Sequence, residues 1–370
     1  MRILHVYKDY YPVLGGIENH VRLLAEAQAA LGHAVTVLVT DPGPRTTCCE
    51  LNGVRVIRAA RLATVASTPL SLALPRALAR QVADVTHLHF PYPLSEAAYL
   101  LAGRGRRAVL SYHSDVVRQK RLLRLYAPIM ERVMRSVDRI VVATPNYLAS
   151  SPVLRRYHDK CCIIPYGINR RRFVEADEAA ARALRRQLGG GRLLLFVGVL
   201  RYYKGVRYLL EAMARLDPRL DARLVIVGDG PEGGALRRQA EILGITGRVV
   251  FCGRVPDEAL PLYYRAADLF VLPASERSEA FGLVQLEAMS SGLPVLCTEL
   301  GTGTSYVNQH DASGWVVPPR DADALARAIE KLLSDEALRR RLAAGALARS
   351  EQFSADGMVR EILDVYRELV

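Results

Sequence analysis

Two nearby glutamates, Glu279 and Glu287, are the side chains whose type and spacing suggest chemistry most directly. They lie in SERSEAFGLVQLEAMSSGLPV, where the preceding FVLP predicts a short buried strand, ASERSEAFG a polar turn and LVQLEAMSSG a helix. Glu279 is then on the loop and Glu287 in the first turns of the helix, so both carboxylates can accept hydrogen bonds from a polyhydroxylated ligand. Unpaired backbone N–H groups around 281–283 would favour a hydroxylated or anionic ligand too. Spacing alone still favours a simpler interpretation, two acids stabilised by the helix dipole.

Two cations and two glycines supply what a phosphate group needs. Arg201 and Lys204 lie in VGVLRYYKG, on a loop after a predicted strand, where a guanidinium fork and an ammonium charge can converge on one anion. The helix dipole disfavours cations at a helix start, which weakens a purely structural explanation of the pair. Gly228 and Gly230 in VGDGPE end a strand and begin a turn, a design common at nucleotide sites and also found in any strand–loop–helix unit.

The histidines and cysteines predict no metal site. His113 ends a predicted strand in LSYHSD, where a lone histidine is more often structural. His87 and His89 alternate with apolar residues in DVTHLHF, and because no third ligand is apparent we expect packing or cleft-lining roles for them. The six cysteines form no C-x-x-C pair and are expected to be free thiols. The D-A-D at 321–323 is expected to cap a helix rather than bind a metal.

Strand-like and helix-like segments alternate along the chain. RILHV, AVTVLVT, VRVIR, DVTHLHF, RAVLSYH and DRIVVAT predict strands in the first half, and LLLFVG, ARLVIVGDG, RVVFCG, ADLFVLP and PVLCT predict them in the second. Amphipathic helices such as GIENHVRLLAEAQAALG and GVRYLLEAMARL separate the strands. The alternation predicts the α/β class with two doubly wound domains, each a parallel sheet covered on both faces. Ligands bind at the carboxyl ends of such strands, so we expect a site in the cleft between the domains.

Bulk composition indicates anionic partners. The chain has 370 residues, a formal net charge of +12 and a pI near 9.6. No run approaches the roughly 20 apolar residues needed to span a bilayer, and the start lacks the pattern of a signal peptide, so we expect a cytoplasmic protein. The segment RQKRLLRLYAPIMERVMRSVDR predicts a basic amphipathic helix. It suits peripheral contact with an anionic membrane surface and suits a solvated outer face equally well. Nucleic-acid binding lacks an accompanying motif and is not expected.

Six segments occur in the order typical of one enzyme family: GGIENHV, YHSD, PYGIN, FVGVLRYYKG, VGDGPE and GTGTSYVNQHDASGWVVPPRD. With the E-x7-E of Glu279 and Glu287, they make the whole chain resemble the retaining glycosyltransferases of family 4, which have the two-domain GT-B fold. The resemblance implies Rossmann-like domains at residues 1–166 and 167–350, with a last helix at 351–370 crossing back to the first domain. It also implies that a sugar is transferred from a nucleotide-diphosphate sugar without metal or other cofactor.

The resemblance assigns roles to individual residues. The catalytic positions are His113, Arg201, Lys204 and Glu279, with the two cations stabilising the leaving diphosphate. Arg201 takes the arginine role because Val199 stands where the family often has arginine. Glu287 would bind ribose hydroxyls, and the backbone at 254–255 would bind the base. The donor-binding positions are Gly15, Gly16, Gly228, Gly230, Arg254, Val255, Phe281, Gly282, Leu283 and Glu287, and the acceptor-facing positions are Glu18 and Asn19.

Within the family, GTGTSYVNQHDASGWVVPPRD and RYYKG most resemble bacterial transferases that build O-antigen or related surface polysaccharides. This favours transfer of mannose or a related hexose from GDP-mannose to a polysaccharide or lipid-linked oligosaccharide. The alternatives are a UDP-sugar-dependent transferase, a non-catalytic GT-B protein that binds a nucleotide or a membrane, and an epimerase or phosphorylase on the same fold. Val199 is the feature that favours a non-catalytic protein.

Overall fold

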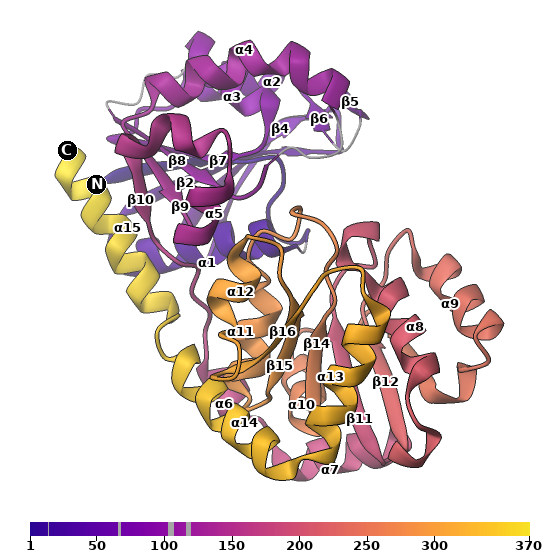
Figure 1. Cartoon of the computed structure of the whole chain (residues 1–370). Coiled ribbons are helices and arrows are strands. Elements are labelled where there is room, and N and C mark those ends of the chain that lie inside the picture. The colour runs from indigo at the N-terminus through magenta and orange to yellow at the C-terminus, as the bar shows by residue number, and fades with distance from the viewer. Residues whose placement is uncertain (14, 66–67, 103–106, 116–119) are drawn as a thin grey trace. The chain divides into compact units, whose positions relative to one another are not determined.

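The chain folds into two compact units, each built on its own sheet (Figure 1). The computed structural model describes residues 1–13, 15–65, 68–102, 107–115 and 120–370, without the side chains of 120–125. The first unit comprises Met1–Gly167 and Ala355–Val370, and the second comprises Ile168–Ser354.

The first unit has an eight-stranded sheet in which all neighbours but one are parallel. Along the sheet the strands are β10 (Cys161–Ile163), β9 (Arg139–Val142), β8 (Arg107–Tyr112), β7 (Val85–Phe90), β1 (Arg2–Val6), β2 (Ala34–Asp41), β4 (Val54–Ala60) and β3 (Thr47–Leu51). The expectation of a purely parallel sheet is wrong at one edge, because β3 and β4 form an antiparallel hairpin joined by Asn52 and Gly53, both with positive φ. A separate short hairpin pairs β5 (Ala63–Val65) with β6 (Thr68–Leu70).

Helices cover both faces of this sheet, as alternating strand and helix patterns predict (Figure 1). They are α1 (Gly16–Ala30), α2 (Ala73–Ala79), α3 (Pro93–Ala102), α4 (Lys120–Ser136), α5 (Pro145–Ser150) and α15 (Ala355–Leu369). The last helix, α15, packs on α1 and buries Ile362 and Tyr366. The C-terminal helix therefore belongs to the first unit, although the second unit precedes it in the sequence.

The second unit has a six-stranded parallel sheet. Its strands, in spatial order, are β13 (Val249–Gly253), β12 (Ala222–Val227), β11 (Arg192–Val197), β14 (Leu269–Leu272), β15 (Val295–Thr298) and β16 (Gly314–Val317). Its helices are α6 (Arg171–Val174), α7 (Glu178–Gln187), α8 (Val206–Arg215), α9 (Gly233–Ile242), α10 (Leu260–Ala266), α11 (Leu283–Ser290), α12 (Gly303–Val307), α13 (Ala322–Ser334) and α14 (Glu336–Ser350). Asp321 caps α13 by accepting a hydrogen bond from Ala324 N at 2.8 Å, which confirms the capping role predicted for the D-A-D.

Residues 351–354 belong to the second unit, whereas the expected boundary put them with the terminal helix. Phe353 is buried there against Phe281 and Tyr306. Ser354 forms a backbone bridge with Ile168. The backbone bridge and the aromatic contacts hold this segment in the second unit. The helical periodicity of the sequence predicts neither of these interactions.

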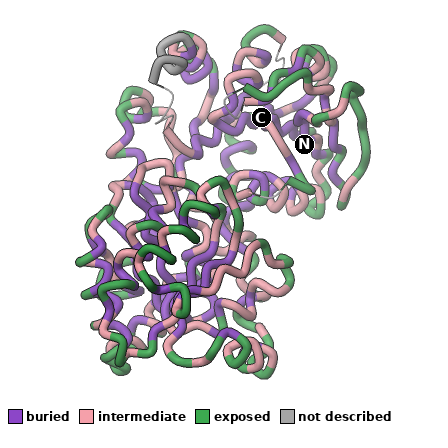
Figure 2. Tube along the Cα trace, turned by 90° about the vertical axis from the view of Figure 1, so that its right-hand side faces the viewer, coloured by how far each residue is buried: buried purple, intermediate pink, exposed green. Residues whose placement is uncertain are grey.

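Burial follows the sheets within each unit, with buried residues along the strands and on the inner faces of the helices (Figure 2). In the described part of the chain no helix combines the length and apolarity needed to cross a membrane. The cationic side chains Arg104, Arg106, Arg118, Lys120, Arg121 and Arg124 of the basic segment lie outside the described residues. Membrane contact by that segment stays a prediction.

Candidate functional site

The loops that carry Lys204 and Glu279 follow adjacent strands at the switch point of the second sheet. From β11 the chain proceeds through β12 and β13 on one side, and then through β14, β15 and β16 on the other. Helical connections therefore diverge at the carboxyl ends of β11 and β14, and such a point is where doubly wound sheets bind ligands. Lys204 follows β11 and Glu279 follows β14, so the topology brings together two segments far apart in the sequence.

Lys204 and Glu279 form a buried ion pair. The ammonium Nζ lies 2.5 Å from a carboxylate oxygen of Glu279, and the side chains are only 12% and 9% exposed. Burial alone would lower the pKa of Lys204, but the Glu279 carboxylate outweighs it and the net shift of that pKa is upward. Lys204 is thus held charged beside the Glu279 side chain at the end of the sheet.

The backbone around Glu279 is fixed by the start of α12. Thr302 donates its hydroxyl hydrogen to the Glu279 carbonyl oxygen at 2.8 Å, and Gly303 N–H donates to the Ala280 carbonyl at 2.7 Å. On the lysine side, Gly205 has φ +68°, and a side chain there would collide with the Pro273 carbonyl oxygen. The two loops are packed main chain against main chain, which leaves the pair little freedom.

Glycines bring the strand-end backbones into contact. A Cβ on Gly228 would overlap the Gly198 carbonyl oxygen, and one on Gly230 would lie 2.6 Å from the Leu200 carbonyl oxygen. Gly228 N–H donates to the Gly253 carbonyl at 2.7 Å, so the segment that continues into Arg254 and Val255 lies at the same sheet edge. The predicted donor-binding positions of these loops are therefore adjacent in space. Gly198, with φ +153°, belongs to the same set of close-packed glycines. It lies in FVGVL, and the sequence did not indicate a role for it.

Gly282 is the N-cap of α11, and its φ of +78° turns the chain into Leu283, the first residue of the helix. The Phe281 side chain is buried against Phe353, and its carbonyl oxygen accepts a hydrogen bond from the Gln285 side chain at 3.1 Å. Glu287 accepts a hydrogen bond from the Tyr264 hydroxyl at 2.7 Å. Burial raises the pKa of Glu287 to about 7, and the Tyr264 hydroxyl partly offsets that rise. No sequence signal pointed to Tyr264, which comes from α10.

Arg201 differs from its partner in the predicted cation pair. It precedes a short 3-10 turn at Tyr202–Lys204 and is exposed, whereas the Lys204 side chain is largely buried and paired with Glu279. The two cations are close in the chain, but only Lys204 is fixed by a carboxylate of the site.

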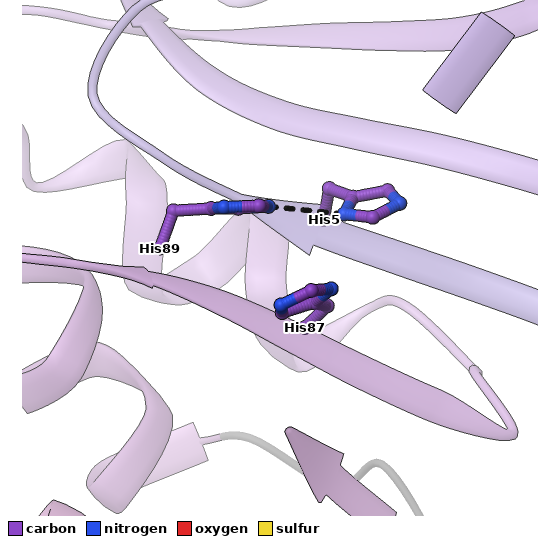
Figure 3. A group of neighbouring side chains, drawn as sticks. All are labelled: His5, His87 and His89. Carbon is purple, nitrogen blue, oxygen red and sulfur yellow. Dashed lines mark hydrogen bonds between the residues drawn. The ribbon is translucent and has the colours of Figure 1, made fainter. Parts of the chain in front are cut away.

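In the first unit, His113 is part of a buried cluster of histidines. The switch point of this sheet lies between β1 and β7, and His5 of β1 stands beside His87 and His89 of β7 (Figure 3). His5 Nδ1 lies 3.1 Å from His89 Nε2, and His89 Nδ1 lies 3.0 Å from His113 Nε2. Burial lowers the pKa of each of these imidazoles, to about 4 for His5, so they are neutral at pH 7.

The cluster provides the third potential metal ligand that was not apparent from the spacing of His87 and His89 in the sequence. Two groups of side chains have ligand atoms within 4.8 Å of one another, one made of His5, His87 and His89 and the other of His20, His89 and His113. His5, His87, His89 and His113 already use both ring nitrogens in hydrogen bonds. Hydrogen bonding therefore accounts for most of the cluster, and His20 is the member with no hydrogen-bond partner within the described residues.

The glycine pair lies at the start of α1, where Gly15 is the N-cap and Gly16 is the first helical residue. A Cβ on Gly15 would collide with the Glu18 carboxylate, whereas Gly16 has open space around it. Glu18 is buried, and its carboxylate lies 3.6 Å from Lys8 Nζ. Asn19 is exposed on the same first turn. Glu18 thus has a structural partner, and Asn19 is the more accessible of the predicted acceptor-facing residues.

All six cysteines are free, as predicted. Cys48 and Cys49 are exposed on β3, and Cys297 is buried in β15. Burial raises the pKa of the Cys297 thiol to about 12, so it stays protonated.

Comparison with known proteins covers both units. Residues 14–172 match the family model "Glycosyltransferase Family 4", and residues 181–349 match "Glycosyl transferases group 1". O-antigen chain mannosyltransferase C of Escherichia coli is 40% identical over 100% of this chain and 99% of its own. D-rhamnosyltransferase WbpZ of Pseudomonas aeruginosa is 40% identical over 90% of this chain and 86% of its own. A sucrose-phosphate synthase from Thermosynechococcus elongatus has the same fold, with a TM-score of 0.82, 26% identity and 100% and 98% coverage.

The two matched models fall on the two units, and the resemblance to O-antigen chain mannosyltransferase C extends over nearly the whole of both chains. The chain therefore belongs to the glycosyltransferases described by the family 4 and group 1 models and has their GT-B fold.

Proposed function

We propose that this glycosyltransferase acts in O-antigen assembly and transfers mannose or a related hexose from GDP-mannose to a polysaccharide or lipid-linked oligosaccharide. The observation that carries the proposal is the buried Lys204–Glu279 pair at the switch point of the second sheet. It places a fixed cation beside glycine backbones that can approach a diphosphate. The names of the two 40%-identical relatives, an O-antigen chain mannosyltransferase and a D-rhamnosyltransferase, support the sugar class.

In this proposal the second unit binds the donor. Lys204, assisted by exposed Arg201, stabilises the negative charge that develops on the leaving diphosphate. Gly228 and Gly230 let their loop pack against the carbonyl oxygens of Gly198 and Leu200, which fixes the loop that leads to Lys204. The backbone at 254–255 receives the base, and Glu287 accepts hydrogen bonds from the ribose hydroxyls.

The chemical step breaks the bond between the anomeric carbon and the diphosphate oxygen. The sugar acquires oxocarbenium character, and the carboxylate of Glu279 stabilises its positive charge. The backbone N–H groups at 281–283 donate hydrogen bonds to the sugar hydroxyls. The acceptor hydroxyl oxygen then bonds to the anomeric carbon from the face that the diphosphate leaves. Its proton passes to the departing phosphate oxygen, so configuration is retained without a covalent enzyme intermediate and without a metal.

The first unit contributes His113, which in this proposal contacts the transferred sugar, and the α1 start with Gly15, Gly16, Glu18 and Asn19. Asn19 is exposed and suits contact with the acceptor. An acceptor carried by a lipid would also give the basic segment that contains α4 a role at an anionic membrane surface. Neutralising Arg118, Lys120, Arg121 and Arg124 should then reduce association with anionic liposomes, and unchanged association would remove that role.

A donor screen followed by anomeric analysis of the product tests the proposal. In a thermal-shift panel, GDP at a hundredfold excess over its dissociation constant should stabilise the protein by about 2.7 kcal/mol, whereas UDP and ADP should stabilise it less. Incubation with GDP-mannose and a lipid-linked oligosaccharide should give an α-linked mannoside, because the donor is α-linked. A larger shift with UDP would favour a UDP-sugar enzyme. No shift with any nucleotide, and no product, would contradict transfer.

A non-catalytic protein is the second candidate, and the exposed Val199 is the observation that favours it. Such a protein would bind a nucleotide without turnover. Donor hydrolysis or transfer that disappears in Lys204→Ala would rule it out.

A further inference from the structure

Five of the eight histidines lie buried together in the first unit, and transfer chemistry as proposed uses only one of them. They are His5, His20, His87, His89 and His113. Burial of a polar ring without hydrogen bonds costs free energy, so buried imidazoles are expected to have hydrogen-bond partners.

A continuous chain of hydrogen bonds runs from Tyr166 to Gln28 through three of these rings. The Tyr166 hydroxyl lies 2.5 Å from His113 Nδ1, and His113 Nε2 lies 3.0 Å from His89 Nδ1. His89 Nε2 lies 3.1 Å from His5 Nδ1, and His5 Nε2 lies 2.8 Å from the side-chain oxygen of Gln28. The chain crosses β1, β7 and the end of β8, and the link between His5 and His89 is drawn in Figure 3.

Neutral imidazoles make this chain directional. Each neutral ring has one N–H donor and one bare nitrogen acceptor, so the direction of one bond dictates the direction of the next. In the structure the side-chain oxygen of Gln28 faces His5 Nε2, and an amide oxygen can only accept, so with this amide orientation His5 donates from Nε2 and accepts at Nδ1. His89 then donates from Nε2 to His5, His113 donates from Nε2 to His89, and Tyr166 donates to His113 Nδ1.

We propose that His89, His5 and Gln28 are positioning residues that hold His113 as the neutral tautomer with its proton on Nε2, so that His113 Nδ1 can only accept a hydrogen bond. A ligand group that replaces Tyr166 at that nitrogen must therefore be a donor. A sugar hydroxyl meets this condition, and a phosphate or carboxylate oxygen does not. The identification of the ligand as a sugar rests on the proposed function, whereas the tautomer does not.

The same chain orients His113 rather than conducting protons. Moving each proton one step toward Gln28 would leave a tyrosinate at Tyr166 and two protons on His5. Burial lowers the pKa of His5 to about 4, and an amide oxygen takes no proton at neutral pH, so the chain ends there.

Nitrogen-15 NMR of the full chain with labelled histidine tests the proposal directly, because protonated and bare ring nitrogens resonate far apart. His113 is assigned by comparison with His113→Gln. We expect Nε2 protonated and Nδ1 bare in His113, His89 and His5, unchanged from pH 8 to pH 6. A proton on His113 Nδ1, or a charged His113 ring in that range, would overturn the assignment. The tautomers are read from the wild-type spectrum, and the variant serves only to assign the His113 signals.

Variants separate positioning from packing. His89→Leu removes the acceptor of His113 Nε2 and should disturb the His113 tautomer, with about a tenfold loss of turnover. The matched control is His87→Leu, since His87 is equally buried and its ring stacks on His89 at 4.5 Å, yet its nitrogens bond to Tyr366 and Ser111 instead. It should leave the His113 tautomer unchanged. Equal disturbance by both variants would show that the cluster acts only as core.

Addition of Zn²⁺ tests the alternative that the histidine cluster binds a metal. A metal held by His20, His89 and His113 would replace the shared proton, since a ligating nitrogen must be bare. His113 would then carry its proton on Nδ1 or ligate through Nδ1, and one Zn²⁺ would stay bound per chain after dialysis. Stoichiometric retention that His20→Gln abolishes would overturn the positioning role in favour of a metal site. If no donor supports transfer, the proposed function fails while the tautomer result still stands.

Discussion

Removing one member of the Lys204–Glu279 pair should destabilise the second unit far more than removing both. The pair is separated by 2.5 Å, with side chains 12% and 9% exposed. At an effective dielectric constant of about 20, Coulomb's law gives an attraction of about 6 to 7 kcal/mol at this distance. Transfer of each ion from water costs several kcal/mol, so the intact pair contributes little net stability.

The single variants lose the attraction but keep one desolvation penalty. Lys204→Met leaves the Glu279 carboxylate buried without its cation, and Glu279→Leu leaves the ammonium without its anion, so each should lower the free energy of unfolding by about 3 to 5 kcal/mol. The double variant Lys204→Met/Glu279→Leu removes both charges and should lie within about 1 kcal/mol of the wild type.

Urea unfolding followed by tryptophan fluorescence measures this in the right unit, because the only tryptophan, Trp315, lies in β16. The control is Arg171→Met, which removes an exposed ion pair with Glu175 in the same unit and should hardly shift the transition. A Lys204→Met transition that coincides with the wild type would refute a buried, mutually dependent pair. So would a double variant as unstable as either single one.

The same set of variants separates stability from catalysis. The double variant should be stable yet lack the cation that stabilises the leaving diphosphate, so its turnover should fall by several orders of magnitude. Near-normal transfer by that folded protein would remove Lys204 from the catalytic role.

Three further predictions concern pH and backbone packing. Burial lowers the pKa of His5 to about 4 and of His20 to about 3, so the unfolded chain binds protons that the folded one cannot. The free energy of unfolding should be full above about pH 7.5 and fall by about 1.3 kcal/mol per histidine by pH 5.5. In thermal unfolding, His20→Leu should reduce this loss by about 1.3 kcal/mol. The pKa of Glu287 is raised to about 7, so its contribution to stability is largest below its pKa in the unfolded chain and is lost as pH rises through 7. Because the ionised carboxylate accepts hydrogen bonds from ribose hydroxyls better, calorimetry should show nucleotide affinity rising from pH 6 to 8. Glu287→Gln should flatten that profile. Gly228→Ala meets a neighbouring carbonyl oxygen at a φ of +128° and should destabilise the second unit by at least about 2 kcal/mol in urea, whereas Gly247→Ala enters open space and should cost little.

Much of the architecture could be predicted from local sequence. The segments RILHV and LLLFVG became the core of central strands because continuous apolar runs between turn residues suit strands buried on both faces. Strand β16 and the antiparallel β3 were not predicted. β3 is largely exposed, and its TCCEL sequence lacks the alternating apolar pattern that would have marked it.

The sequence by itself determined the fold class, the glycosyltransferase family and the catalytic candidates, because ordered motifs and hydrophobic periodicity are local properties. Only the tertiary structure decided which candidates act together. It paired Lys204 with Glu279, gave Glu287 a tyrosine from another helix, and left Arg201 exposed. It also joined His113 to His89 and His5 through ring nitrogens. These contacts arise where parallel strands from distant parts of the chain end side by side, and no spacing in the sequence encodes which ends will be neighbours.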